Sequence, residues 1–187
     1  MLRPSPKSLY LRLLPALCLL AASLSNFGLS LEDLRRSPGL TPFTFASHFR
    51  NFDFAFRKEV QRPEVFLASK SGDCDDFSTL AAVVLRERGY TPRLISIRMP
   101  GVTHVVCYIE EAGAYLDYNF RNSGTPLVKS GASVEEIADS VARSYKLRWT
   151  SASEFTFGGD VKRLVHTVVQ PSRTSKMPPN ILASLFR

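Results

Sequence analysis

The sequence predicts an α+β protein in which helices, one of them led by a cysteine, pack against an antiparallel sheet. Apolar residues recur at three- and four-residue spacing over 77–85 and again over 133–145, as in helices with one buried face. Alternating or β-branched stretches at 90–98 and 102–109 predict strands. A chain of 187 residues with 44% hydrophobic composition can bury one core, so we expect one domain over 31–170.

The first of these helices begins at a polar turn that places a cysteine in its first turn. Asp73 can accept backbone N–H bonds as the N-cap, and Gly89 ends the helix as a C′ glycine does. Cys74 therefore lies where unpaired N–H groups and the helix dipole favour an anion. A thiolate forms more readily there and is the reactive state of cysteine, so we interpret Cys74 as a nucleophile.

The strand at 102–109 and a following strand at 115–119 predict a hairpin that brings a histidine and an acid together. If the turn is centred between residues 111 and 112, His104 and Asp117 share a face, where the carboxylate could orient the imidazole. A turn one residue longer would put Asp117 on the other face. Asn119, directly opposite His104 in the favoured register, is the alternative partner.

The rest of the chain predicts structural elements. Ser133 and Glu136 form a capping box at the start of the second helix. Residues 146–157 and 162–170 predict two more strands. Residues 31–42 contain proline and glycine, which interrupt regular structure, and predict a connecting segment.

A phenylalanine-rich segment, 43–57, predicts a helix that packs over the cysteine helix with its aromatic side chains in the core. Its last three phenylalanines alternate as in a strand, which is the alternative.

Cys107 is three residues from His104 on one strand and so points to the opposite face, away from Cys74. We therefore expect a buried apolar side chain there rather than a disulfide partner.

Three stretches of sequence surround the cysteine, the histidine and the acid. They are Gly72-Asp73-Cys74-Asp75-Asp76-Phe77-Ser78, Thr103-His104-Val105-Val106 and Tyr115-Leu116-Asp117-Tyr118-Asn119. Together they resemble the transglutaminase-like superfamily, and within it the bacterial transglutaminase-like cysteine proteinases, over roughly residues 45–120. The resemblance implies a papain-like catalytic triad of Cys74, His104 and Asp117. Relatives often carry an aromatic residue before the Pro63-Glu64 pair, and this chain does not, which leaves the second oxyanion donor open.

In such a triad His104 takes the proton of Cys74, the thiolate attacks an amide carbonyl, and Asp117 holds the histidine tautomer. The backbone N–H of Cys74 would help to bind the oxyanion. The acyl-enzyme then meets water, giving a peptidase or amidase for a protein or peptide substrate, or an amine, giving glutamine cross-linking. A catalytically silent binding domain with the same fold is a further alternative. Small size, export and the closer motif match favour hydrolysis.

Two acidic residues follow Cys74 and admit two interpretations. Asp75 and Asp76 stabilise a first helical turn by about 0.3–1 kcal/mol each through the dipole. They oppose a neighbouring thiolate, so a cation such as protonated His104 must outweigh them. Alternatively, together with Asp73 they could offer oxygens to calcium, as the resemblance to some related proteases suggests. No other cofactor is expected, because the cysteines and the histidines have no zinc spacing.

The first 30 residues have the parts of a secretory signal peptide: basic residues, an apolar run over 13–22, and small residues after it. The run is shorter than the ~20 residues of a bilayer crossing, so we expect a periplasmic or secreted protein without a stable membrane span; retention as an anchor is the alternative. Residues 171–187 predict a C-terminal tail. Net charge is +7, and the basic residues are scattered without an aromatic platform, so no nucleic-acid partner is expected.

Overall fold

The computed structural model describes residues 28–158 and 161–170. The signal peptide expected over 1–30 lies almost wholly outside the described residues, and the tail expected over 171–187 lies wholly outside them. None of the described helices is long and apolar enough to cross a membrane.

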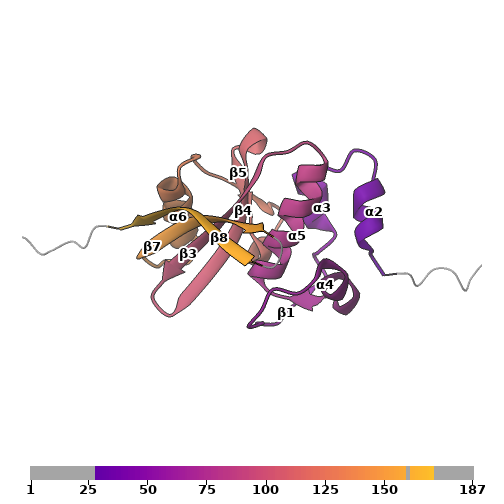
Figure 1. Ribbon diagram of the computed structural model, residues 1–187, viewed down its shortest axis with the longest axis horizontal. Helices are drawn as coiled ribbons and strands as arrows, with labels where there is room; N and C mark the ends of the chain where they lie inside the picture. Colours follow the sequence, from indigo (N-terminus) through magenta and orange to yellow (C-terminus); the bar gives the residue numbers. More distant parts are fainter. Residues whose placement is uncertain (1–27, 159–160, 171–187) are drawn as a thin grey trace, which may run out of the picture.

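A six-stranded antiparallel sheet forms the centre of the protein, with strand order β6-β5-β4-β3-β7-β8 (Figure 1). A separate two-stranded parallel pair, β1 and β2, precedes the cysteine helix. The strands are β1 Asp53–Phe54, β2 Ser71–Gly72, β3 Pro92–Met99, β4 Val102–Ile109, β5 Ala114–Leu116, β6 Leu127–Lys129, β7 Ser151–Gly158 and β8 Val161–Val169.

Helices cover both faces of the sheet, so the predicted α+β class is confirmed (Figure 1). Val105 and Ile109 of β4 point into one core cluster with α5, whereas Val106 and Tyr108 point into a second cluster with α6. The helices are α2 Leu31–Arg36, α3 Pro42–Ser47, α4 Pro63–Ser69, α5 Cys74–Glu87 and α6 Val134–Ser144, with 3₁₀ turns η4 Glu110–Ala112 and η5 Tyr118–Phe120.

The cysteine helix has the boundaries that its capping residues predict. Asp73 is the N-cap of α5 and Cys74 its first residue. The helix ends at Glu87, and Gly89 takes the left-handed conformation at φ +84°. The capping box of Ser133 at the start of α6 is likewise present.

The hairpin has the favoured register. Cys107 pairs with Leu116, so the next position in register places Asp117 opposite Val106, two residues from His104. The second strand is shorter than predicted, because β5 ends at Leu116 and the chain turns into η5. The cause is Asp117 itself, whose carboxylate accepts the backbone N–H of Asn119 and caps the 3₁₀ turn.

Three predicted elements, two near the N-terminus and one in the C-terminal half, differ in part from the structure. Residues 31–42, expected as a connection, contain α2, which Ser30 caps in a reciprocal capping box with Asp33. The helix expected over 43–57 is only the six residues of α3; after it the chain turns and pairs with β2. The strand expected from residue 146 begins at Ser151, because Lys146 is left-handed and ends α6 there.

The phenylalanine-rich segment is correspondingly divided between core and surface. Phe45, Phe49 and Phe52 are buried and pack on one another. Phe43, Phe54 and Phe56, also expected in the core, are 45%, 55% and 81% exposed.

Cys107 is free and fully buried, and burial raises the pKa of its thiol. It lies on the face opposite to His104, as expected, but that is the face that α5 covers. The Cys107 thiol is therefore kept unreactive by its burial, and not by pointing away from the helix that carries Cys74.

Candidate active site

A rigid turn presents Cys74. The Asp73 carboxylate accepts the backbone N–H of Asp75 at 3.0 Å and that of Arg57 at 2.8 Å. The Asp76 carboxylate accepts the Asp73 N–H at 3.0 Å and both the backbone N–H and the side-chain amide of Gln61 at 2.6 and 2.8 Å. Both acids are buried, so these bonds fix the backbone on either side of the cysteine.

Gly72 is required by this turn because the space beside it is filled. A Cβ atom on Gly72 would lie 2.4 Å from Asp76 Oδ2, 2.7 Å from Phe66 Cδ2 and 2.8 Å from Gln61 Nε2. The glycine thus permits the close approach of the Asp76 carboxylate that holds the start of α5.

The early end of β5 opens one side of β4 at the histidine. His104 pairs with Ile97 on β3, while the β4 to β5 ladder covers only Cys107 to Ile109. Helix α5, which leads with Cys74, contacts η5 at this open side. The His104 side chain lies near the Cys74 thiol there, close enough for the thiol to raise the pKa of the imidazole. A residue of the helix layer and a residue of the sheet are thus brought together where β5 stops short of His104.

Asp117 lies behind the imidazole. His104 Nε2 is 2.9 Å from Asp117 Oδ1, and the two side chains are 3% and 0% exposed. The N–H does not point along this contact well enough for a hydrogen bond, so the contact is an ion pair. Asp117 Oδ1 also accepts the N–H of Asn119 at 2.8 Å. Because Nε2 faces the acid, Nδ1 is the ring nitrogen that remains for Cys74.

The electrostatics favour a charged histidine. Burial opposes the charge on His104, but the Asp117 carboxylate and the contact with Cys74 outweigh it and raise the pKa to about 10. The surroundings of His104 therefore favour its charged form, which lies beside the acidic turn around Cys74.

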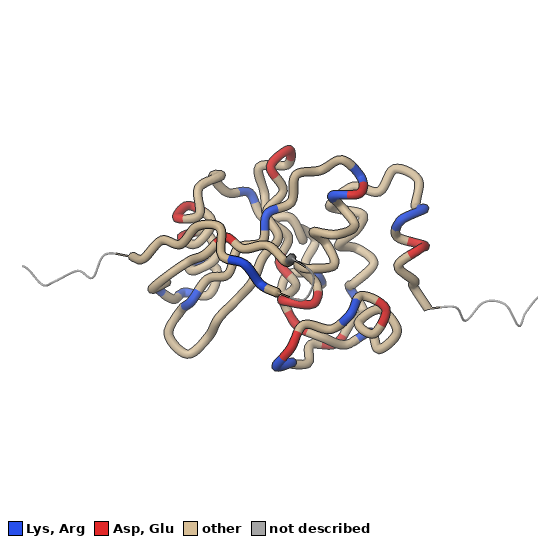
Figure 2. The backbone as a smooth tube through the Cα atoms, in the orientation of Figure 1, with Lys and Arg blue, Asp and Glu red and all other residues tan. Residues whose placement is uncertain are grey.

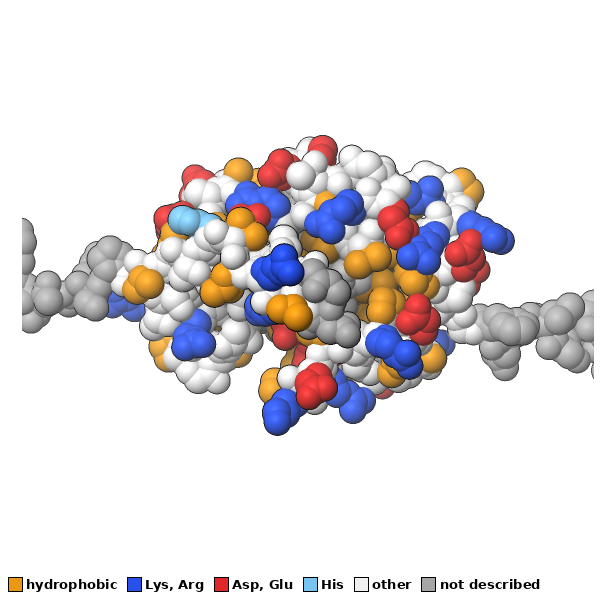
Figure 3. Space-filling model, in the orientation of Figure 1, with side chains coloured by type: hydrophobic (Ala, Val, Ile, Leu, Met, Phe, Trp, Pro, Cys, Tyr) orange, Lys and Arg blue, Asp and Glu red, His pale blue; other side chains and the backbone are white. Residues whose placement is uncertain are grey.

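Asp75 points toward the same region. Burial and the Asp73 charge raise its pKa, while Lys162 of β8 and His104 act in the opposite direction. Basic residues at the start of β8 lie over the acidic start of α5 (Figure 2). Figure 3 shows basic and acidic side chains near one another on the surface of this face.

The structure also brings to the site two residues that the sequence analysis did not select. Tyr145, at the end of α6, lies against the ring of His104. Gln61 holds Asp76 and donates its amide to Ser71 O at 3.0 Å, so its amide is already committed. Neither residue has a sequence signal of its own, because each reaches the site from an element remote from the motifs.

A calcium site is not supported by the donor atoms. The oxygens of Asp73 and Asp76 accept backbone and amide N–H groups. Within 28–158 and 161–170, no three acidic, histidine or cysteine side chains are grouped so as to hold a metal ion. Asp73 and Asp76 form the capping box of α5, which is the structural interpretation of the turn.

The other two histidines lie elsewhere. His48 is the C-cap residue of α3, and His166 is an exposed residue of β8 opposite Glu154. The candidate site thus consists of Cys74, His104 and Asp117.

Comparisons with known proteins give little beyond the fold. No family model and no curated protein matches this sequence. Among solved structures, the chain is similar to calcium-bound LapG of Legionella pneumophila, with a TM-score of 0.46 and 16% identity over 84% of this chain and 85% of that one. The likeness concerns the arrangement of the chain alone.

Proposed function

We propose that the protein is an exported thiol hydrolase that cleaves amide bonds of a protein or peptide through an acyl-enzyme. Cys74 is the nucleophile, His104 the general acid and base, and Asp117 the group that orients and charges the histidine. The observation that carries the proposal is the position of His104, which is buried, lies 2.9 Å from the Asp117 carboxylate and is near enough to Cys74 for the thiol to affect its pKa. The apolar leader supports export.

The proposed reaction takes place in the following steps. The Cys74 thiolate attacks the carbonyl carbon, and the carbonyl electron pair moves to oxygen, where the Cys74 backbone N–H at the start of α5 can donate to it. His104 gives its proton to the departing amine as the C–N bond breaks. Neutral His104 then takes a proton from water, which attacks the thioester and expels the thiolate. Throughout, Asp117 stabilises the protonated imidazole.

Alkylation with iodoacetamide tests the nucleophile directly. At pH 6.5 we expect Cys74 to react at least tenfold faster than a free cysteine, because the imidazolium favours the thiolate. His104→Ala should remove this advantage, and Cys74→Ser should abolish labelling at that peptide. Cys107, which is buried, is the internal reference and should stay unlabelled in the folded protein. A rate for Cys74 equal to that of a free thiol at every pH would contradict the proposal.

A second candidate is a catalytically silent domain that binds a peptide. One observation favours it: the Gln61 amide, a potential oxyanion donor near the cysteine turn, donates to Asp76 and Ser71 instead. A mixture of quenched fluorescent peptides separates the two candidates. An enzyme releases fluorescence that Cys74→Ser abolishes, whereas a silent domain binds peptides equally well with either residue. A labelled amine in the same mixture shows whether the acyl group passes to amines or to water.

A further inference from the structure

Helix α6 ends abruptly next to the proposed catalytic histidine. Tyr145 is the C-cap, and Lys146 follows in the left-handed conformation at φ +55°. The Lys146 N–H donates to Arg143 O at 3.0 Å and the Leu147 N–H to Ala142 O at 2.9 Å, which is a Schellman motif. Helix α5 has a glycine, Gly89, at the equivalent position. Helix α6 instead has Lys146, although the left-handed conformation is unfavourable for a residue with a side chain. The sharp end places the Tyr145 side chain at the candidate site.

The aromatic ring of Tyr145 covers one side of the imidazole. The ring centroids of Tyr145 and His104 are 5.1 Å apart, with an angle of 52° between the planes. The His104 residue is only 2% exposed, whereas Tyr145 is half-buried. Tyr145 thus lies between the imidazole and solvent at this side.

The hydroxyl group of Tyr145 is tied to the acid of the site. The side-chain amide of Asn119 donates a hydrogen bond to the Tyr145 hydroxyl, and the backbone N–H of Asn119 donates to Asp117 Oδ1. One residue therefore links the aromatic cover to the carboxylate that faces His104. Burial raises the pKa of Tyr145, and the charges of Asp117 and Cys74 act in the same direction, so the cover stays uncharged.

We propose that Tyr145 is a positioning residue for His104, whose ring holds the imidazole with one nitrogen toward Asp117 and the other toward Cys74. The inference rests on the proposed thiol chemistry. Asp117 contacts the imidazole at its Nε2 nitrogen. The Tyr145 ring, inclined at 52° to the imidazole, adds a second contact that restricts its rotation. An imidazole that turns away from the thiol loses most of its effect on the reaction, since proton transfer depends on alignment.

Four variants of the full chain test the proposal. Tyr145→Ala removes the ring, and Tyr145→Phe keeps the ring but removes the hydroxyl. Asn119→Ala removes the amide but keeps the backbone N–H to Asp117. Tyr90→Phe is the matched control, because Tyr90 is another half-buried tyrosine, at the far end of α5 and roughly 20 Å along the helix from Cys74.

Two readouts are measured: the rate of Cys74 alkylation by iodoacetamide from pH 5 to 10, and the ¹⁵N NMR signals of the His104 ring. Tyr145→Ala should slow alkylation at neutral pH by about tenfold or more and broaden or shift the His104 signals. Tyr145→Phe should stay within about threefold of the wild type, as should Asn119→Ala. The double variant Tyr145→Phe with Asn119→Ala should cost no more than either single change, since both remove one hydrogen bond.

A Tyr145→Ala protein with wild-type alkylation rates and unchanged His104 signals overturns the proposal. If that variant does not fold, Tyr145→Leu replaces it, and unchanged rates and signals there overturn the proposal equally. The proposed function fails separately, through a wild-type Cys74 that reacts like a free thiol. The His104 signals then decide alone whether Tyr145 fixes the ring, because they do not depend on thiol reactivity.

Discussion

Replacing Gly72 with alanine should disrupt the turn that presents Cys74. The new methyl group would lie 2.4 Å from Asp76 Oδ2 and 2.7 Å from a ring carbon of Phe66, distances that real contacts do not tolerate. Asp76 Oδ2 accepts two of the three hydrogen bonds at this carboxylate, each worth about 1.5–3 kcal/mol, and overpacking adds about 1–3 kcal/mol. Relaxation returns part of this sum, so we expect unfolding to become about 4 kcal/mol easier.

Urea denaturation followed by circular dichroism measures the loss, and iodoacetamide labelling reports the slower reaction of Cys74 that should accompany it. Gly124→Ala is the control, because a Cβ there meets no atom within 4 Å and the midpoint should hardly move. Asp76→Ala removes the nearest of the three groups that the methyl would clash with. Gly72→Ala should therefore cost less in an Asp76→Ala background than in the wild type, and full additivity of the two changes would refute the reasoning.

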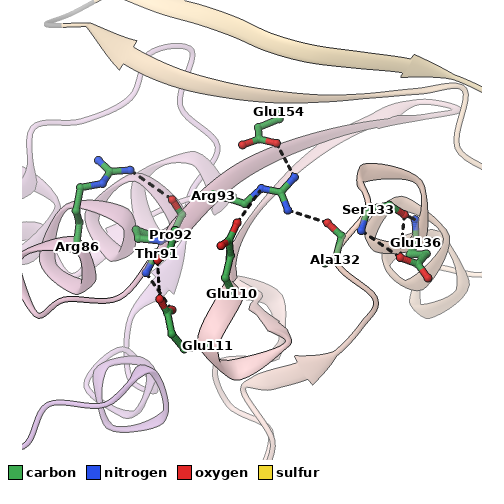
Figure 4. Close-up of polar contacts among 10 residues, drawn as sticks. All are labelled: Arg86, Thr91, Pro92, Arg93, Glu110, Glu111, Ala132, Ser133, Glu136 and Glu154. Atoms are coloured by element: carbon green, nitrogen blue, oxygen red, sulfur yellow. Dashed lines mark hydrogen bonds and ion pairs between the residues drawn. The ribbon is translucent and has the colours of Figure 1, made fainter.

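Further predictions concern charge and backbone conformation. Asp117→Asn should lower the pKa of His104 from about 10, because burial disfavours the charged imidazole and the negative charge that offsets this effect is removed. An NMR titration of His104 measures the change. In the wild type this raised pKa contributes stability that is complete below pH 6.5 and lost as pH rises toward 10; urea midpoints at pH 6, 8 and 10 should fall in that order. Arg93→Leu should cost about 2–4 kcal/mol, because it leaves the Glu154 carboxylate, 2.6 Å away and mostly buried, without its partner (Figure 4). Gly89→Ala should cost about 1 kcal/mol, seen as a lower Tm, because φ is +84° there.

Matched changes check these outcomes. Arg35→Leu breaks a pair with Glu87 that is 40% and 44% exposed, so it should cost much less stability than Arg93→Leu. An equal loss of stability for Arg35→Leu and Arg93→Leu would show that burial does not determine how much the Arg93–Glu154 pair stabilises the fold. An Asp117→Asn protein in which His104 still titrates near pH 10 would remove the carboxylate as the cause of the shift.

Local signals in the sequence predicted the parts of the site that depend on neighbours along the chain. Asp73 and Gly89 bound α5 because capping is a property of a few adjacent residues. The pairing that sets Asp117 near His104 follows from period-two alternation and the length of one turn. These features were therefore predictable without knowledge of tertiary packing.

The parts that were missed depend on contacts between remote segments. Phe54 and Phe56 share the composition of the buried phenylalanines before them, and nothing in the local sequence separates them from Phe49 and Phe52. Gln61 and Tyr145 acquire their partners from α5 and β4. The three-residue strand β6 is too short to show an alternation that could be distinguished from chance.

The burial of Cys107 has a practical consequence. The Cys107 sulfur reaches water only when α5 separates from the sheet. The rate at which a thiol reagent modifies Cys107 in dilute urea therefore measures how often the whole fold opens. Cys74, half-exposed in the same molecule, reports on the intact fold. Peptide mass spectrometry of one labelled sample can thus time two events at once, and a variant that merely loosens the fold is told apart from one that alters chemistry.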